Sequence, residues 1–276
     1  MKIAFIGGGN MATALISGLF SSGDGVDKIQ VADPGVDVQK RLQEQWPLTC
    51  VSSAVDAIQD MDMIVLAVKP QVLPIVLKEI GSKVSSTQVV ISIVAGIPLA
   101  QIAAQLQAGP PVVRTMPNTP ALIGLGITGL YASKNCTAHH RQMAEALMQA
   151  AGETVWLEEE SLLDVVTAVS GSGPAYFFYM IEAMSNAGTQ LGLSKEVANS
   201  LALHTAYGAS AMAIQSDVDV SELRRRVTSK GGTTQAALDQ FKAGGFEGLV
   251  DSAINAATQR AQELAANAAQ TKESQV

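Results

Sequence analysis

The sequence predicts a doubly wound α/β region with a mostly parallel sheet, followed by an all-helical region. Two observations carry this prediction. Short apolar segments alternate with helical patterns from residue 2 to about residue 160, as in a sheet whose strands are joined by helices. From there to the end of the chain, helical patterns continue and no convincing strand appears. We therefore divide the chain into residues 1–160 and residues 161–276.

The N-terminus carries the most informative local pattern. Lys2–Ile6 is a short apolar run, long enough for a buried parallel strand. Gly7, Gly9 and Ala12 follow with the spacing G-x-G-x-x-A, where a helical pattern opens. In dinucleotide-binding turns these small residues permit a tight turn, a close backbone approach to pyrophosphate, and close packing of helix on strand. The N–H groups of the helix then face the phosphates, so the pattern predicts a Rossmann-type dinucleotide site. A tight turn with a purely structural role is the alternative.

Strands and helices then alternate along the first region. The apolar runs predict strands at Lys28–Ala32, Met61–Val68, Gln88–Val94, Pro111–Met116, Gly126–Ala132 and Thr154–Leu157. The intervening patterns predict helices at Met11–Ser21, Val38–Gln45, Ser53–Gln59, Leu73–Ile80, Pro98–Gln107 and His139–Ala150. Two prolines make Pro117–Pro120 a stiff loop.

The second region reads as helix throughout. Apolar spacing and Pro, Ser or Thr starts predict helices at Ser161–Val169, Pro174–Gly192, Lys195–Gln215, Ser221–Thr228, Thr233–Ala243 and Phe246–Ala268. The polar tail Thr271–Val276 is expected to fray.

Composition and charge exclude several classes of protein. The chain has 276 residues, of which 47% are hydrophobic, and its net charge is −7. Because no dense basic stripe is present, we expect no nucleic-acid partner. Cys50 and Cys136 lie far apart without neighbouring metal-type ligands, so we expect neither a disulfide scaffold nor a metal site. No run approaches the ~20 apolar residues of a membrane span and no signal peptide is visible, so we expect a cytoplasmic protein without a membrane partner.

Two strand ends are candidate cofactor contacts. Ligands of doubly wound folds bind beyond the carboxyl ends of the strands. Ala67–Gln71, which includes Val68, Lys69 and Pro70, and Val94–Gly96, which includes Ala95, should therefore border the cofactor. Plain strand-to-helix connections are the alternative for both segments.

Two small-residue loops in the helical region are candidate anion sites. Ser170–Ala175 and Ser229–Thr234 each join a glycine-containing loop to the start of a helix, where free N–H groups and the helix dipole favour a carboxylate. Ordinary helix capping is the alternative. His139, His140 and His204 have ordinary structural interpretations, and Arg224–Arg226 is expected to be a solvated or inter-subunit charge cluster.

These segments together resemble the pyrroline-5-carboxylate reductase family. The motifs that carry the resemblance occur in order at residues 6–11, 67–70, 114–120, 168–176 and 227–234, and the resemblance spans roughly Lys2 to Leu264. It implies hydride transfer from NAD(P)H to the C5 of (S)-1-pyrroline-5-carboxylate, giving L-proline in the last step of proline biosynthesis. It also implies that the helical region is a dimerisation domain, in a homodimer or a ring of dimers up to a decamer.

The resemblance also assigns residues to sites. Pyrophosphate would be held by Ile6, Gly7, Gly8, Gly9, Asn10 and Met11, and the ribose side of the cofactor by Ala67, Val68, Lys69 and Pro70. Asn118 would lie in the loop near the nicotinamide. The substrate carboxylate and ring nitrogen would be bound by Ser229, Gly231, Gly232, Thr233 and Thr234.

The sequence departs from the family pattern at two positions. Lys230 stands where proline is common in the Gly-Gly-Thr loop, so that loop should be less rigid. Asp33, at the end of the second strand, replaces the small hydroxyl residue of many NADPH-using members. A carboxylate there accepts bonds from a free ribose 2′-OH and repels a 2′-phosphate, which favours NADH. Lys40 or Arg41 could reverse that preference, and we expect NADP(H), with NAD(H) as the alternative.

A protonated cyclic imine is already electron-poor, so the enzyme needs mainly to orient two bound partners. Any proton could come from solvent or from a hydroxyl such as that of Thr234. A β-hydroxyacid dehydrogenase has a similar layout, but it needs a lysine as base, and the helix after Gly173 has none in Ala175–Met180. A protein that binds NAD(P) without catalysis is the alternative from another class.

Overall fold

The computed structural model describes residues 1–23 and 25–270, so the tail predicted to fray lies outside the described residues. The chain forms two compact units. Unit 1 comprises Met1–Gly171 and the chain from Ala257 onward, and unit 2 comprises Ser172–Ala256. Each unit is described by itself below.

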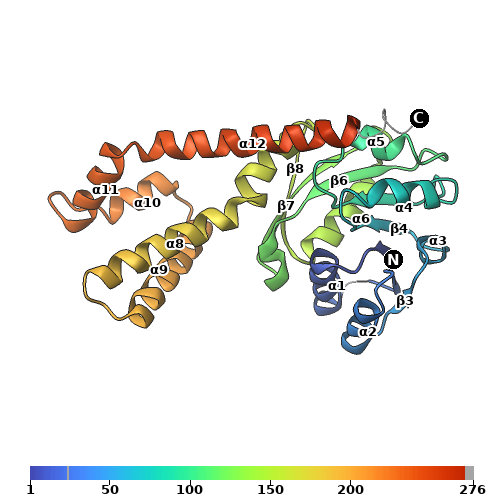
Figure 1. Cartoon of the computed structure of the whole chain (residues 1–276), viewed down its shortest axis with the longest axis horizontal. Helices are drawn as coiled ribbons and strands as arrows, with labels where there is room; N and C mark the ends of the chain where they lie inside the picture. Colours follow the sequence, from blue (N-terminus) through green and yellow to red (C-terminus); the bar gives the residue numbers. More distant parts are fainter. Residues whose placement is uncertain (24, 271–276) are drawn as a thin grey trace. The chain divides into compact units, whose positions relative to one another are not determined.

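Unit 1 is built on an eight-stranded sheet with the order β3-β2-β1-β4-β5-β6-β7-β8 (Figure 1). The strands are β1 (Lys2–Ile6), β2 (Lys28–Ala32), β3 (Thr49–Val51), β4 (Met63–Leu66), β5 (Val89–Ser92), β6 (Val112–Met116), β7 (Gly126–Ala132) and β8 (Gly152–Trp156). All neighbours are parallel except β6 and β7, which confirms the predicted mostly parallel sheet. Strand β3 was not predicted from the sequence; it is only three residues long and pairs at the sheet edge.

Helices cover both faces of this sheet, as the alternation of residues along β1 requires. Ile3 and Phe5 belong to one core with α1 (Asn10–Ser22), α2 (Val36–Gln45) and α6 (Ala138–Gln149). Ala4 and Ile6 belong to the other, with α3 (Ala54–Ala57), α4 (Leu73–Ile80) and α5 (Leu99–Ala103). Both cores are apolar and buried. The parallel strands β1, β2, β4, β5 and β6 therefore end at one common edge of the sheet, where the connections to α1, α2, α4 and α5 begin.

Several predicted elements differ in detail. Thr119–Ile123 forms the 3₁₀ helix η1, so the second half of the predicted Pro117–Pro120 loop is helical. Helix α5 ends at Ala103, short of the predicted Gln107. The predicted helix Ser161–Val169 divides into α7 (Leu162–Val166) and the π-helix η2 (Thr167–Gly171).

The described residues of unit 2 form helices joined by loops, without a strand, as predicted. Its elements are α8 (Gly173–Gln190), α9 (Lys195–Gln215), α10 (Val220–Arg226), α11 (Thr233–Ala243) and the first part of α12 (Phe246–Gln270). Pro174 occupies the first turn of α8, where the helix itself needs no N–H from it. Within residues 1–23 and 25–270, no helix is both long and apolar enough to cross a membrane.

Candidate functional site

The turn between β1 and α1 has the geometry that its small residues predicted. Gly7 has a φ of +105°, and a Cβ added there would lie 2.5 Å from the carbonyl oxygen of Ala67. Any other residue would therefore be strained and would collide with backbone. The turn is also tied to its neighbours, because Gly7 N–H donates to Ala32 O at 2.8 Å and Ala67 N–H donates to Ile6 O at 2.8 Å.

The next glycine opens onto free space. A Cβ added to Gly9 would meet nothing described within 4 Å, and Gly9 forms the N-cap of α1 without a side-chain hydrogen bond. Because Gly9 has no side chain, backbone is exposed at the start of this 13-residue helix, where the first N–H groups are those of Asn10 and Met11. Ala12 is 1% exposed and packs the helix onto the sheet. A backbone cradle of this kind fits a pyrophosphate, which accepts N–H hydrogen bonds at a helix N-terminus.

Two charged side chains hold the middle residue of the loop. The Gly8 N–H donates to Asp33 Oδ2 at 2.8 Å, and the Gly35 N–H donates to Asp33 Oδ1 at 2.8 Å. At the other end of the same residue, Arg41 Nη2 donates to Gly8 O at 3.1 Å and also to Thr13 Oγ1 at 3.3 Å. The structure thus brings Arg41 to the glycine loop. Lys40 instead lies 3.9 Å from Glu44 on the surface of α2.

The ends of β4 and β5 lie at the same edge of the sheet as the glycine loop. Ala67 and Val68 are half-buried there, and the Lys69 carbonyl accepts hydrogen bonds from Val72 and Leu73 as the chain turns into α4. Ala95 is exposed after β5, and Gly96 follows with a φ of +73°.

Asn118 follows β6 at this edge and is only 8% exposed. Its carboxamide oxygen accepts from Ile127 N–H at 2.9 Å, and its amide group donates to Ser170 O at 3.1 Å. The family resemblance implies a place for Asn118 in the loop near the nicotinamide, but no sequence signal pointed to its bond with Ser170.

In unit 2, the loop Ser229–Thr234 leads into α11 as predicted. Gly231 has a φ of +72°, its N–H donates to Gln235 Oε1 at 2.7 Å, and Gly232 N–H donates to Ser229 O at 3.0 Å. Gly232 is the N-cap of α11 and has no side-chain capping bond. The first turn of α11 therefore begins at backbone with two threonine hydroxyls beside it, an arrangement suited to a carboxylate.

A basic hollow of about 560 Å³ borders this loop. Its lining includes Arg224, Arg225, Lys230 and Lys242, and one carboxylate, Asp239. Arg225 forms a two-bond ion pair with Glu222, at 2.6 and 2.7 Å, and this pair is the main reason that the pKa of Glu222 is lowered. The predicted charge cluster Arg224–Arg226 is thus partly neutralised on the surface of unit 2.

Comparisons with known proteins account for nearly the whole chain. Residues 160–264 match the family model for pyrroline-5-carboxylate reductase dimerisation, and residues 2–96 match that for NADP oxidoreductase, coenzyme F420-dependent. A pyrroline-5-carboxylate reductase of Pseudomonas aeruginosa is 48% identical over 264 residues, covering 96% of this chain and 97% of the relative. The chain belongs to the pyrroline-5-carboxylate reductase family.

Solved structures agree with this membership. A pyrroline-5-carboxylate reductase of Coxiella burnetii is 37% identical and superposes with a TM-score of 0.89 over 95% of this chain and 97% of that one. A Plasmodium falciparum pyrroline carboxylate reductase with NADP bound is 29% identical, with a TM-score of 0.83 over 96% of this chain and 98% of that one. The Mycobacterium tuberculosis H37Rv reductase is 40% identical over 95% of this chain and 96% of its own length.

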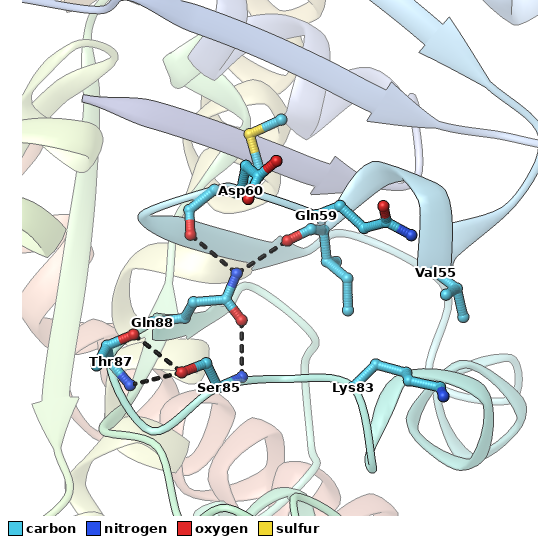
Figure 2. A pocket seen from close by; sticks show the side chains of 9 residues that line it. Val55, Gln59, Asp60, Lys83, Ser85, Thr87 and Gln88 are labelled. Carbon is cyan, nitrogen blue, oxygen red and sulfur yellow. Dashed lines mark hydrogen bonds between the residues drawn. The ribbon is translucent and has the colours of Figure 1, made fainter.

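In this reductase fold, a second hollow lies at the edge of the sheet opposite the glycine loop. The hollow of about 340 Å³ in Figure 2 borders the starts of β4 and β5, away from the glycine loop. The buried Gln88 carboxamide spans it, donating to Ile58 O and Met61 O and accepting from Ser85 N–H. These hydrogen bonds hold three backbone segments together, so we assign a structural role to Gln88 and to the hollow that it spans.

The histidines also have structural uses in this reductase fold. His140 completes a capping box with Thr137 at the start of α6. His204 Nδ1 lies 2.8 Å from Ser200 O, one turn earlier in α9.

Proposed function

We propose that this chain reduces (S)-1-pyrroline-5-carboxylate to L-proline with hydride from NADPH, the last step of proline biosynthesis. One observation carries this proposal. A Cβ added to Gly9 would meet no described atom within 4 Å, whereas a Cβ added to Gly7 or Gly8 would collide with neighbouring atoms. Such a loop fits a dinucleotide, and membership of the reductase family supplies the reaction.

The coenzyme would be held by residues at the carboxyl edge of the sheet. Its pyrophosphate fits the N–H groups of the glycine loop and of the first turn of α1. The residues assigned to the coenzyme as a whole are Ile6, Gly7, Gly8, Gly9, Asn10, Met11, Asp33, Ala67, Val68, Lys69, Pro70, Ala95 and Asn118. Asn118 would border the nicotinamide without bonding to it, because its carboxamide is already bonded to Ser170 O and Ile127 N–H. When bound, the coenzyme supplies hydride from the nicotinamide C4. The residues of the chain bind and orient it, and they exclude water from its reactive face.

The substrate carboxylate would bind at Ser229, Gly231, Gly232, Thr233 and Thr234. Support comes from the free first turn of α11 and the positive charges of the adjoining hollow. Thr234, half-buried in that first turn, is our candidate for a hydroxyl that contacts the carboxylate or the ring nitrogen. Because an iminium carbon is already electron-poor, orientation supplies most of the rate enhancement and no strong general acid is needed.

Two observations support NADPH as the main coenzyme. Both carboxylate oxygens of Asp33 already accept backbone N–H bonds, which reduces its capacity to bind ribose hydroxyls. Arg41 places a guanidinium beside the same loop, where it offers a positive charge to a 2′-phosphate.

The helical region supports a homodimer, assembled further into a ring of dimers such as a decamer. Residues 160–264 match a dimerisation model, and α8 exposes Phe177, Phe178 and Tyr179. Large exposed apolar patches mark surfaces that pack against other molecules. A cytoplasmic location is our proposal from the sequence.

A turnover assay tests the proposed reaction. The full chain is mixed with pyrroline-5-carboxylate and either NADPH or NADH, and the loss of absorbance of the reduced coenzyme and the formation of proline are followed. Turnover with NADPH in preference to NADH is expected. Oxidation of a β-hydroxyacid instead would support the dehydrogenase alternative. Coenzyme binding without turnover of either substrate would support a non-catalytic binding protein.

A further inference from the structure

The chain leaves unit 1 through a segment whose geometry is unusual. The π-helix η2 (Thr167–Gly171) follows α7 and ends where unit 2 begins. A π-helical turn is rare and is frequently found at functional sites. Two side chains of this segment bond to the backbone of the preceding helix α7, with Thr167 Oγ1 donating to Leu163 O at 2.7 Å and Ser170 Oγ donating to Val166 O at 3.0 Å.

The carbonyl of Ser170 has lost its ordinary helical partners. In an α-helix it would accept from the residue four positions later, but that residue is Pro174, which has no N–H. The N–H one position further, at Ala175, donates instead to Ser172 O at 3.0 Å. A carbonyl in this position needs a donor from elsewhere.

Asn118 supplies that donor. Its Nδ2 donates to Ser170 O at 3.1 Å, and its Oδ1 accepts from Ile127 N–H at 2.9 Å. The chemistry fixes the orientation of the carboxamide, because a carbonyl can only accept and a backbone N–H can only donate. Asn118 therefore joins the end of β6, the start of β7 and the π-helix η2.

A close contact between η2 and β6 accompanies this hydrogen bond. A Cβ added to Gly171 would lie 2.8 Å from Met116 Cε, so the glycine brings η2 against the last residue of β6. Because β6 ends at the same edge as β1, β4 and β5, the carboxamide orders the edge that borders the coenzyme site.

We propose that Asn118 is a positioning residue for the reduction, which acts by holding the Ser170 carbonyl and so fixing the edge of the site at η2. The inference rests on the proposed function for its effect on turnover, but not for the bond itself. Misplacement of such an edge should lower kcat, since errors of about 1 Å in alignment cost roughly a hundredfold. The pyrophosphate cradle at Gly9 belongs to another loop, so coenzyme affinity should change little.

The test uses Asn118→Asp, because a protonated carboxyl reproduces both bonds and an ionised one does not. At low pH the introduced carboxyl can donate to Ser170 O and accept from Ile127 N–H. At high pH its charge faces a carbonyl oxygen, and burial raises its pKa above the usual value. We expect kcat of Asn118→Asp to be about tenfold to a hundredfold below that of the wild type at pH 8, with the deficit shrinking as the pH falls to 5.5.

Asn118→Ala carries no titratable group, so its deficit relative to the wild type should be the same at every pH. The charged side chains on β6 and around α7 include Arg114, Glu160 and Asp164. Dividing by the wild type at each pH removes any effect that the two proteins have in common. Asn135→Asp is the matched control. That carboxamide also donates to a backbone carbonyl, Gly109 O at 3.1 Å, but it lies in an exposed turn after β7. It should show no pH-dependent deficit.

Two measurements do not depend on turnover. The Kd for NADPH, from fluorescence titration, should stay within about threefold of the wild type in both Asn118 variants, which is less than 0.7 kcal/mol. The melting temperature of Asn118→Asp without coenzyme should approach that of the wild type at low pH. It should fall behind as the pH rises through the raised folded-state pKa.

Three results would overturn the proposal. They are a pH-independent melting deficit for Asn118→Asp, a variant-to-wild-type kcat ratio that does not depend on pH, and a loss of NADPH affinity as large as the loss of kcat. If Asn118→Asp does not fold at pH 8, the comparison of kcat with Kd in Asn118→Ala decides. If the wild type does not reduce pyrroline-5-carboxylate, the proposed function fails, and the melting series still tests the bond.

Discussion

The carboxylate of Asp33 accepts the backbone N–H of Gly8 at 2.8 Å, so the residue at the end of β2 holds the loop at the end of β1. Arg41 holds the other end of the same residue through Gly8 O at 3.1 Å. A negative and a positive group thus flank one glycine of the coenzyme loop. Asp33 therefore has two roles to separate, loop support and charge near the ribose.

Replacing Asp33 should separate these roles. Asp33→Asn removes the charge but keeps an acceptor oxygen, whereas Asp33→Ser removes the charge and shortens the side chain. Both should raise the ratio of kcat/KM for NADPH to that for NADH by about fivefold, since the Coulomb repulsion of a 2′-phosphate is ~1 kcal/mol at an exposed site. Both should also lower the two values together through a looser loop, and Asp33→Asn should lower them less, because it keeps one of the two oxygens that accept from Gly8 N–H and Gly35 N–H. Steady-state kinetics with both coenzymes measures this.

Asp37→Asn is the control, because it removes a charge from the exposed first turn of α2. It should leave the ratio unchanged. An unchanged ratio in both Asp33 variants would mean that the carboxylate points away from the ribose and that another group distinguishes the coenzymes.

Gly9 and Gly7 should respond to substitution in opposite ways. Gly9→Val places a side chain in open space, so the melting temperature should hold, while NADPH affinity should fall at least a hundredfold, or about 2.7 kcal/mol. Gly7→Ala forces a Cβ to within 2.5 Å of Ala67 O at a φ of +105°, so it should lower the melting temperature. Calorimetry and fluorescence titration separate the two effects. Wild-type NADPH affinity in folded Gly9→Val would contradict the cofactor assignment.

The sequence predicted the features that depend on local pattern. Apolar runs located β1, β2 and β4 to β8. Among these, β1, β2, β4 and β5 are buried parallel strands, which are continuous in hydrophobicity. Thr49–Val51 escaped notice because a three-residue edge strand with a polar first residue carries too little periodicity.

Long-range contacts account for the rest. Of the π-helix at Thr167–Gly171, residues 167–169 were expected as plain helix and residues 170–171 as the start of a loop, because the sequence has no local sign of an extra residue per turn. The bond between Asn118 and Ser170 joins residues 52 positions apart. Likewise, the G-x-G-x-x-A spacing predicted an open backbone at Gly9 but could not show that Asp33 and Arg41 flank Gly8. Such contacts follow from the topology of the sheet, which brings separate strand ends to one edge.

The stability of the protein should depend on the ionisation of Asp164 in α7. Burial raises the pKa of Asp164, opposed by Arg114 and reinforced by Glu160. A folded-state pKa above the unfolded value gives stability that is complete at low pH and lost as the pH rises through the folded-state pKa. We therefore expect the melting temperature of Asp164→Asn to gain on that of the wild type as the pH rises from 4 to 7. A constant difference would contradict the shift.

Glu222 provides the opposite case. Arg225 and Arg226 lower the pKa of Glu222. Its contribution to stability is therefore present at pH values above the unfolded-state pKa and is lost as the pH falls through the folded-state pKa. The melting temperature of Glu222→Gln should therefore lie below that of the wild type at pH 7, and the difference should shrink at acid pH. Because this carboxylate is solvent-exposed, the effect should be smaller than that at Asp164.

The exposed aromatic residues of α8 should be buried between copies of the chain. Phe177 and Phe178 are 63% and 65% exposed. Light scattering at micromolar concentration should give at least twice the chain mass of 28.7 kDa. Phe178→Glu should reduce this mass. Ile75→Glu, at a residue of α4 that is 68% exposed, should leave it unchanged. A wild-type monomer under these conditions would contradict the proposed dimer.

Thr234 tests the carboxylate site directly. It lies in the first turn of α11, half-buried, on the loop that Gly231 and Gln235 brace with a hydrogen bond of 2.7 Å. Thr234→Val keeps the volume and removes the hydroxyl, so one bond to a charged group is lost. Such a bond contributes about 1.5–3 kcal/mol, or roughly ten- to a hundredfold in kcat/KM for pyrroline-5-carboxylate.

The matched control is Thr87→Val, which removes a hydroxyl from an exposed turn where it bonds only to Ser85 Oγ at 2.9 Å among the described residues. It should leave kcat/KM unchanged. NADPH affinity should stay constant in both variants, because neither residue belongs to the glycine loop. Wild-type kcat/KM in Thr234→Val would move the carboxylate elsewhere, most plausibly to Ser170–Ser172. A fall in NADPH affinity alone would instead assign the Ser229–Thr234 loop to the coenzyme, because the hydroxyl would then serve the dinucleotide and not the imine.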